Sequence, residues 1–232
     1  MASLFENNRQ TAIVSSFAEL MDAQYDGKIN AVCWERNLKG DFKEIVTKLQ
    51  LKENITEVTV EDLLALELSE QGYIARETIL EDLRLLTESG ALPSLNLLKC
   101  YERDEEFNFI STDVYSFHID RSPVATDTIL CTYFGAASEI IENNKVQQKI
   151  HIPEIRAQLK KLYQGKDEDF NAFLEENFFD LHYEMLSQNN PTNLGLGNLW
   201  KLAVGHPEQK VWPCVHRAPK EKDGEYRLLL IC

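Results

Sequence analysis

Two residues with metal-binding side chains, His118 and Asp120, stand two positions apart in a segment rich in β-branched and aromatic residues. On a strand, residues at this spacing project from one face, about 6 to 7 Å apart along the chain, so both can reach one metal ion. A distant histidine, His216, supplies a third ligand if its strand lies alongside. Two imidazoles and one carboxylate on one face of a metal leave the opposite coordination positions open. The spacing therefore predicts a metal site formed by His118, Asp120 and His216.

An arginine, Arg227, follows His216 by eleven residues and begins an apolar run that ends at Ile231. A guanidinium at the start of a buried strand needs an anionic partner, because an unpaired buried charge is costly. Its planar fork can bind a carboxylate with two hydrogen bonds. Tyr133 offers a hydroxyl to the same carboxylate, although a place in the aromatic core suits it equally well. Arg227 and Tyr133 are therefore the candidates for binding an anionic cosubstrate.

The composition of the chain excludes several classes of function. Its 232 residues carry 24 Lys and Arg against 38 Asp and Glu, a net charge of −14 that repels phosphate backbones and anionic lipid surfaces. We therefore expect no nucleic-acid partner and no membrane partner. No apolar run approaches the roughly 18 residues that span a bilayer, and the start of the chain lacks the pattern of a signal peptide. The five scattered cysteines indicate neither a disulfide framework nor a zinc ribbon, so a reducing cytoplasm is the expected location.

The first 92 residues are predicted to form a mainly helical region that packs on the rest of the chain. Apolar residues recur at helical spacing, and Gly90 provides a stop signal after the last such segment. The expected helices span residues 4–21, 42–49, 62–68 and 78–88, and residues 31–34 could form a strand.

Residues 93–232 are predicted to form a β-rich region interrupted by helices. Short runs of β-branched and aromatic residues separated by turn signals are typical of strands in a double-sheet barrel or jelly roll. The expected strands span residues 107–110, 114–119, 128–134, 199–204, 211–215 and 226–231, and two helices are expected near residues 153–162 and 169–186. The predicted fold is thus α+β, a jelly-roll or cupin-like core with an N-terminal helical layer and a helical insertion at about 150–188, in one integrated domain.

The pattern of the candidate site resembles a known enzyme family. H-x-D, a distant His and an Arg eleven residues beyond it are similar to the Fe(II)/2-oxoglutarate-dependent dioxygenases. That resemblance implies a double-stranded β-helix in which His118, Asp120 and His216 bind Fe(II) or another divalent metal. It also implies that Arg227 pairs with the distal carboxylate of 2-oxoglutarate, to which Tyr133 is the second candidate ligand. The 96-residue step from Asp120 to His216 departs from the usual spacing, so the resemblance requires the helical insertion.

A closer resemblance rests on four strings: H-I-D-R-S-P from His118, L-C-T-Y-F-G from Leu130, H-R-A-P from His216, and R-L-L-L from Arg227. These look like an uncharacterised bacterial family built on a domain of unknown function, and the likeness covers roughly the C-terminal 130 residues. This family implies no activity of its own.

The remaining reactive side chains have ordinary structural interpretations. Three histidines are expected to be core, surface or turn residues rather than ligands. Cys214 would share a strand face with His216 and could lie near the metal, although small buried cysteines are common. Two arginines adjacent to the motifs could attract an anionic substrate or form salt bridges. The three histidines are His151, His182 and His206, and the two arginines are Arg121 and Arg217.

Three hypotheses about function follow. The first is an Fe(II)/2-oxoglutarate-dependent oxygenase of the hydroxylase type, acting on an unidentified small molecule or protein. The second is a non-catalytic metal-binding or metal-responsive protein that uses the same pocket. The third is an interaction module in which the helical half of the chain forms a docking surface. A second copy of the chain, in a homodimer, is a further candidate partner.

Overall fold

The leucine-rich strand β13 (Arg227–Ile231) shows how the sequence builds two hydrophobic cores at once. Successive residues of a strand point to opposite faces of its sheet. Leu228 and Leu230 enter a core shared with helices, whereas Leu229 enters a second core shared with another sheet. The chain therefore folds in layers: helices, a larger sheet and a smaller sheet.

The computed structural model describes residues 8–187, 189–220 and 224–232, and strands in these ranges form two sheets. The larger sheet is central to the molecule and has seven strands. In spatial order they are β1 (Thr11–Val14), β2 (Ala31–Trp34), β11 (Leu199–Ala203), β6 (Asp127–Phe134), β13, β4 (Ser94–Leu98) and β3 (Ile55–Glu57). The strands β11, β6, β13 and β4 run antiparallel to their neighbours, and only β1 and β2 pair in parallel.

The smaller sheet has six short strands. In spatial order they are β10 (Thr192–Asn193), β7 (Glu139–Ile141), β12 (Val215–Arg217), β5 (Phe117–His118), β9 (His182–Met185) and β8 (Val146–Gln148). The second core lies between the two sheets: it combines Trp200 and Leu229 of the larger sheet with Ile140 of the smaller one. The sheets therefore pack face to face.

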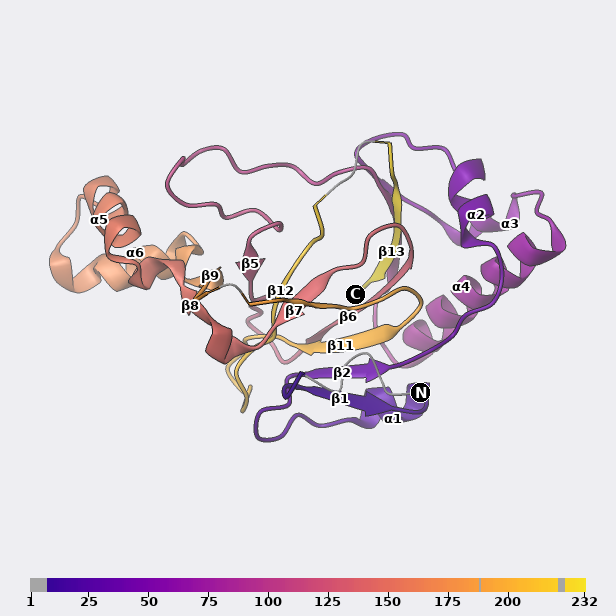
Figure 1. Ribbon diagram of the computed structural model, residues 1–232, viewed down its shortest axis with the longest axis horizontal. Coiled ribbons are helices and arrows are strands. Elements are labelled where there is room, and N and C mark those ends of the chain that lie inside the picture. The colour runs from indigo at the N-terminus through magenta and orange to yellow at the C-terminus, as the bar shows by residue number, and fades with distance from the viewer. Residues whose placement is uncertain (1–7, 188, 221–223) are drawn as a thin grey trace.

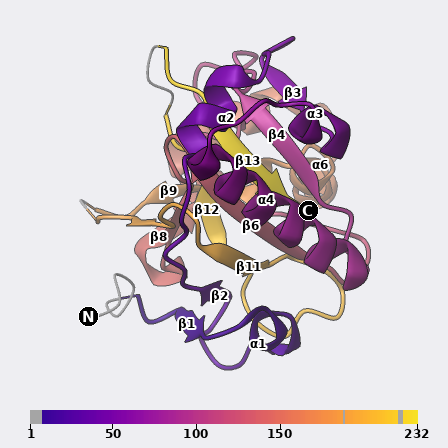
Figure 2. The ribbon, with the colours of Figure 1, turned by 90° about the vertical axis from the view of Figure 1, so that its right-hand side faces the viewer.

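Six α-helices flank the sheets within the described ranges. They are α1 (Phe17–Asp22), α2 (Phe42–Lys48), α3 (Val60–Leu64), α4 (Glu70–Glu88), α5 (Pro153–Leu162) and α6 (Phe170–Glu176). Helices α2, α3 and α4 lie over the outer face of the larger sheet (Figure 2), whereas α5 and α6 lie at the opposite end of the molecule (Figure 1). Ser69 caps the N-terminus of α4, because its hydroxyl accepts a hydrogen bond from Gly72 N–H.

A buried ion pair fastens α4 to the sheet that it covers. The guanidinium of Arg36 binds both carboxylate oxygens of Asp82, at 2.6 and 2.9 Å, and the hydroxyl of Tyr133 donates to the same carboxylate at 2.6 Å. Asp82 is 3% exposed, so this carboxylate depends on its partners for the hydrogen bonds that water would otherwise supply. The network ties helix α4 to strand β6.

The structure confirms the mixture of helices and strands in two sheets, but it corrects several predicted elements. The first 92 residues contribute α1 to α4, as well as three strands that join the larger sheet. The predicted helix 4–21 is wrong where it is described, because β1 precedes α1, and residues 1–7 lie outside the described residues. The predicted strand 107–110 is a loop whose aromatic rings pack against the core of the insertion.

The insertion also differs from its prediction in one respect that affects the site. The predicted helix 169–186 ends early, because α6 stops at Glu176 and Phe178 adopts a left-handed backbone with φ of 59°. The chain then forms β9, which pairs with β5 and with β8. The insertion thus extends the smaller sheet next to His118 instead of remaining a purely helical excursion.

No helix within the described ranges combines the length and the apolar character that crossing a membrane requires.

Loss of the buried carboxylate should unfold the protein more easily. Asp82→Ala leaves the Arg36 guanidinium buried without its carboxylate, which lowers the free energy of unfolding by about 3 to 5 kcal/mol. Tyr133→Phe removes one hydrogen bond and lowers it by about 1 kcal/mol. Urea denaturation measures both effects. Glu81→Gln, in an ion pair at the surface of the same helix, is the matched control and should behave like the wild type; equal effects of Asp82→Ala and Glu81→Gln would contradict the role of the buried pair.

Candidate metal centre

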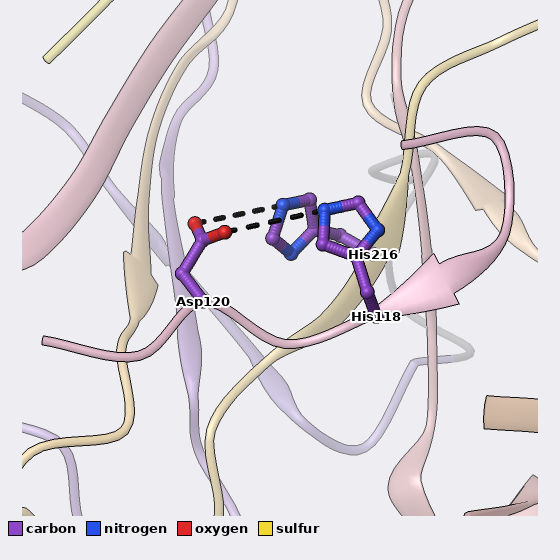
Figure 3. A group of neighbouring side chains, drawn as sticks. All are labelled: His118, Asp120 and His216. Carbon is purple, nitrogen blue, oxygen red and sulfur yellow. Dashed lines mark ion pairs between the residues drawn. The ribbon is translucent and has the colours of Figure 1, made fainter. Parts of the chain in front are cut away.

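The smaller sheet brings His118, Asp120 and His216 together. His118 on β5 and His216 on β12 are directly opposite each other in the antiparallel pairing of these strands. Directly opposite residues extend their side chains from the same face, which places the two imidazoles side by side. Asp120 lies two residues beyond His118, where the chain has just left β5, and its carboxylate turns back towards both rings (Figure 3). These three residues are the predicted metal ligands.

The distances within the triad suit a single metal ion. The Nε2 atoms of His118 and His216 lie 4.0 and 3.6 Å from carboxylate oxygens of Asp120, and the ring centroids are 4.5 Å apart. One ligand atom from each residue lies within 4.8 Å of the other two. Metal–nitrogen bonds of about 2.0 to 2.1 Å place ligand atoms roughly 3 Å apart, so small side-chain rotations would close the triad around an ion.

Backbone carbonyls fix the orientation of both imidazoles. The Nδ1 atom of His118 lies 2.8 Å from the carbonyl oxygen of Ser116, and the Nδ1 atom of His216 lies 3.2 Å from that of Cys214. A carbonyl oxygen only accepts hydrogen bonds, so each Nδ1 carries the hydrogen and each Nε2 keeps a lone pair. In metalloproteins, a hydrogen bond from the non-ligating nitrogen sets the tautomer and the orientation of a histidine ligand. Both lone pairs are thereby available to the centre of the triad.

Burial of His118 and the neighbours of Asp120 together favour the protonation states that a metal requires. The side chains of His118 and His216 are 13% and 12% exposed, and Asp120 is 37% exposed, so the site reaches solvent on the carboxylate side. Burial lowers the pKa of His118 to about 4, and the neighbouring His216 adds to this shift. Burial alone would raise the pKa of Asp120, but His216 and the hydroxyl of Thr128 lower it by more. At neutral pH the site therefore offers a neutral His118 and an anionic Asp120.

A threonine from the larger sheet holds the carboxylate ligand. The hydroxyl of Thr128 on β6 donates to Asp120 Oδ2 at 2.5 Å. The backbone of Asp120 is also held, because its carbonyl accepts a hydrogen bond from Gly205 N–H at 2.9 Å. Contacts of this kind orient metal ligands, and their loss weakens metal binding. The site is thus assembled from both sheets.

Arg227 lies on the side of β13 that faces the smaller sheet. It shares this side with Leu229, is 8% exposed, and donates from Nη2 to the hydroxyl of Ser138 at 3.2 Å. Ser138 directly precedes β7, the strand that pairs with β12 next to His216. Gly135 allows the close packing here, because a Cβ atom at this position would lie 2.4 Å from the carbonyl of Tyr226. Arg227 therefore belongs to the wall between the sheets, although it is not one of the converging ligands.

The structure does not bring Tyr133 to the triad. Tyr133 points to the opposite side of β6, where its ring stacks on Phe42 at 5.4 Å and its hydroxyl donates to Asp82. Thr128, five residues earlier on the same strand, is the β6 side chain that contacts Asp120. The expected role of Tyr133 in binding the carboxylate of a cosubstrate stays a prediction. The geometry described here gives it no support.

His182 is a neighbour of the site that the sequence interpretation missed. It stands directly opposite His118 in the pairing of β9 with β5, and the two ring centroids are 6.0 Å apart. His182 is 7% exposed, and its Nδ1 atom has no hydrogen-bond partner among the described residues. The smaller sheet therefore carries a row of three histidines across β12, β5 and β9. The alternation of apolar and polar residues from His182 to Met185 is the signal that would have indicated a strand here.

The other candidates have structural roles. The guanidinium of Arg121 pairs with Asp180 at 2.8 Å, and that of Arg217 pairs with Glu139 at 2.7 Å, so the salt-bridge interpretation is confirmed for both. Cys214 packs in the core between the sheets and is not among the converging ligand atoms of the described residues; burial raises the pKa of its thiol. His151 and His206 also lie outside the triad.

Comparisons with known proteins add a family but no activity. A family model described as "Protein of unknown function (DUF1826)" matches residues 15–232. No curated protein and no solved structure matches the chain. The match confirms the predicted resemblance to an uncharacterised family and extends it from the C-terminal part to nearly the whole chain. The resemblance to dioxygenases stays a prediction.

Removal of the carboxylate ligand should abolish tight metal binding. Asp120→Ala should weaken Co(II) binding by more than about 100-fold, because changes to the residues behind a ligand already cost roughly 10- to 100-fold. Thr128→Val keeps the shape of the side chain but removes the hydroxyl, and it should weaken Co(II) binding by roughly 10- to 100-fold. Calorimetric titration measures both affinities. His206→Ala is the control and should bind Co(II) normally; wild-type affinity in Asp120→Ala would refute the ligand assignment.

His182 should contribute to the loss of stability in acid. Burial lowers its pKa from 6.5 to about 3, so between these pH values the unfolded chain binds a proton that the folded chain does not. The free energy of unfolding therefore falls as the pH drops through this range. In His182→Leu that fall should be smaller by up to about 3 kcal/mol in urea titrations at pH 7 and pH 4. Replacement of the exposed His151 by Leu is the control and should leave the decrease in the free energy of unfolding between pH 7 and pH 4 unchanged. An equally large decrease in His182→Leu and in the wild type would argue against a neutral buried His182.

Proposed function

This chain belongs to the DUF1826 family of proteins of unknown function, and we propose that it is a non-haem Fe(II)- and 2-oxoglutarate-dependent oxygenase of the hydroxylase type. The observation that carries the proposal is the convergence of two imidazole nitrogens, both with their lone pairs available, and one carboxylate. Two histidines and one carboxylate on one side of a metal are typical of non-haem Fe(II) oxygenases.

The order of the strands supports the fold that this activity implies. From β4 to β7 the chain alternates between the larger and the smaller sheet at every strand, and it alternates again from β10 to β13. These eight strands place four in each sheet, as in a double-sheet jelly roll. The insertion lies between the two halves. A double-stranded β-helix is therefore the fold that we propose for the two-sheet core.

The residues of the triad fit an iron ion chemically. Neutral imidazole and carboxylate are ligands that Fe(II) accepts, and the ligands leave coordination positions vacant for a cosubstrate and dioxygen. When bound, iron and 2-oxoglutarate would supply an oxidant derived from dioxygen, with oxidative decarboxylation of the 2-oxoglutarate. The chain itself would hold His118 and His216 in one tautomer through the carbonyls of Ser116 and Cys214. It would hold Asp120 through Thr128.

In this proposal Arg227 binds the distal carboxylate of 2-oxoglutarate. Its support is the position of the residue: it is buried, cationic and on the side of β13 that faces the sheet of the metal ligands. A guanidinium binds a carboxylate in a two-pronged geometry that an amine cannot match. The hydroxyl of Ser138, already bonded to Arg227, would lie beside the same carboxylate.

The second candidate is a non-catalytic metal-binding or metal-responsive protein. The observation that favours it is that Arg227 already has protein partners, the hydroxyl of Ser138 and the side chain of Tyr101. An arginine satisfied by its own chain would need no cosubstrate. The third hypothesis, an interaction module, would be favoured if His118 and His216 lay far apart, but their ring centroids are 4.5 Å apart.

An anaerobic spectrum separates the first two candidates. Protein loaded with Fe(II) and 2-oxoglutarate should develop a weak visible charge-transfer band. In Arg227→Met the 2-oxoglutarate concentration that gives half of this band should rise by roughly thirtyfold or more, with Fe(II) affinity unchanged, because a buried charge pair is lost. Arg84→Met, which changes an exposed arginine on α4, should behave like the wild type. An Fe(II)-loaded protein without the band would contradict the oxygenase and favour the metal-binding protein.

A further inference from the structure

Lys149 is a buried cation at the edge of the smaller sheet. It follows β8 directly, in the 3-10 turn Lys149–His151, and is 6% exposed. Its ammonium donates to the carbonyl oxygen of Ser111 at 2.9 Å and to the hydroxyl of Ser116 at 2.6 Å. Within the described residues, no carboxylate oxygen lies within 4.0 Å of this ammonium. Among the described residues, the hydrogen-bond partners of this ammonium are therefore two neutral oxygens.

Such a cation is costly for the fold. An ammonium removed from water loses far more solvation than two hydrogen bonds to neutral groups return. The acidic residues nearest to it, Glu184 and Asp113, oppose the effect of burial without cancelling it, so the pKa of Lys149 remains lowered. A methionine would fill the same space without this cost. A bound anion would offset this cost by pairing with the ammonium.

A pocket of suitable size adjoins the ammonium. The cavity is about 250 Å³ in volume, and Lys149, Ser116, Glu184 and Asp113 are among the residues that line it. Three further cationic side chains line it: Arg103, Lys220 and Arg217, the last of which is paired with Glu139. Among the described residues, four cationic and two acidic side chains line this pocket, in a chain whose net charge is −14. The pocket is therefore suited to a small anion.

We propose that this pocket is a binding site for a small oxyanion, either a compact carboxylate or a phosphate, with the buried ammonium of Lys149 as its central ligand. The site is separate from the metal triad, and the proposal does not depend on oxygenase activity. Ser116 nevertheless joins the two: its hydroxyl accepts from Lys149, and its carbonyl accepts from Nδ1 of the metal ligand His118. The anion would thus bind on the far side of a residue that orients the metal centre.

Titration of the metal-free full-length protein tests the proposal. Inorganic phosphate and malonate are the two probes, added at constant ionic strength against chloride, and calorimetry measures the binding. We expect saturable binding of at least one probe at a single site, and the probe that binds identifies the class of anion. Lys149→Met should weaken this binding by roughly thirtyfold or more, as expected when a buried charged partner is removed. Lys166→Met, which changes an exposed lysine, is the matched control and should bind like the wild type.

Two further measurements keep the test decisive. In buffer without phosphate or carboxylate, Lys149→Met should be at least as stable as the wild type, because an apolar side chain of similar volume replaces an unpaired buried charge. If Lys149→Met does not fold, Lys149→Arg, which keeps the charge, and Lys149→Gln, which keeps a donor without the charge, replace it; only the former should bind. Absence of binding in the wild type, or equal binding in Lys149→Gln and Lys149→Arg, would overturn the proposal.

Discussion

The pairing of His118 with His216 across β5 and β12 is the constraint on which the site depends. It sets two imidazoles side by side, and each ring is then fixed by the backbone carbonyl two residues before it in the sequence. Those carbonyls belong to Ser116 and Cys214, which directly precede β5 and β12. The register of the sheet therefore determines the direction of the lone pair on each Nε2. Asp120 completes the triad as soon as the chain leaves β5. A shift of register by one residue would turn a histidine to the other face and destroy the site.

The rest of the fold supports this pairing from three directions. The larger sheet supplies Thr128, which binds Asp120, and the helices beyond it are fastened by the buried pair of Arg36 and Asp82. The insertion supplies β9 and the ion pair of Asp180 with Arg121, the residue after the carboxylate ligand. On the far side of His118, Ser116 links the metal centre to the buried ammonium of Lys149. Each support contacts a ligand or its immediate neighbour, so the triad is held without a bound ion.

The sequence predicted the parts of this structure whose signal is local. Short runs rich in β-branched, aromatic and leucine residues identified β6, β11 and β13, and the two-residue spacing of His118 and Asp120 indicated a shared face. Other features depend on long-range packing. The segment around His182 fits helical spacing as well as a short alternation, and the left-handed turn at Phe178 and the pairing with β5 decide that it forms a strand. Tyr133 shows a second limit: alternation separates the two faces of a strand, but it does not tell which face borders the site. No local pattern marks Lys149 as buried.

X-ray absorption at the edge of the bound metal tests the central claim most directly. In the Co(II)-loaded protein we predict a first coordination shell of nitrogen and oxygen atoms with outer-shell scattering from two imidazoles, and His216→Ala should leave one imidazole. A shell that contains sulfur, or a spectrum with no imidazole scattering, would contradict a metal centre built on the paired histidines.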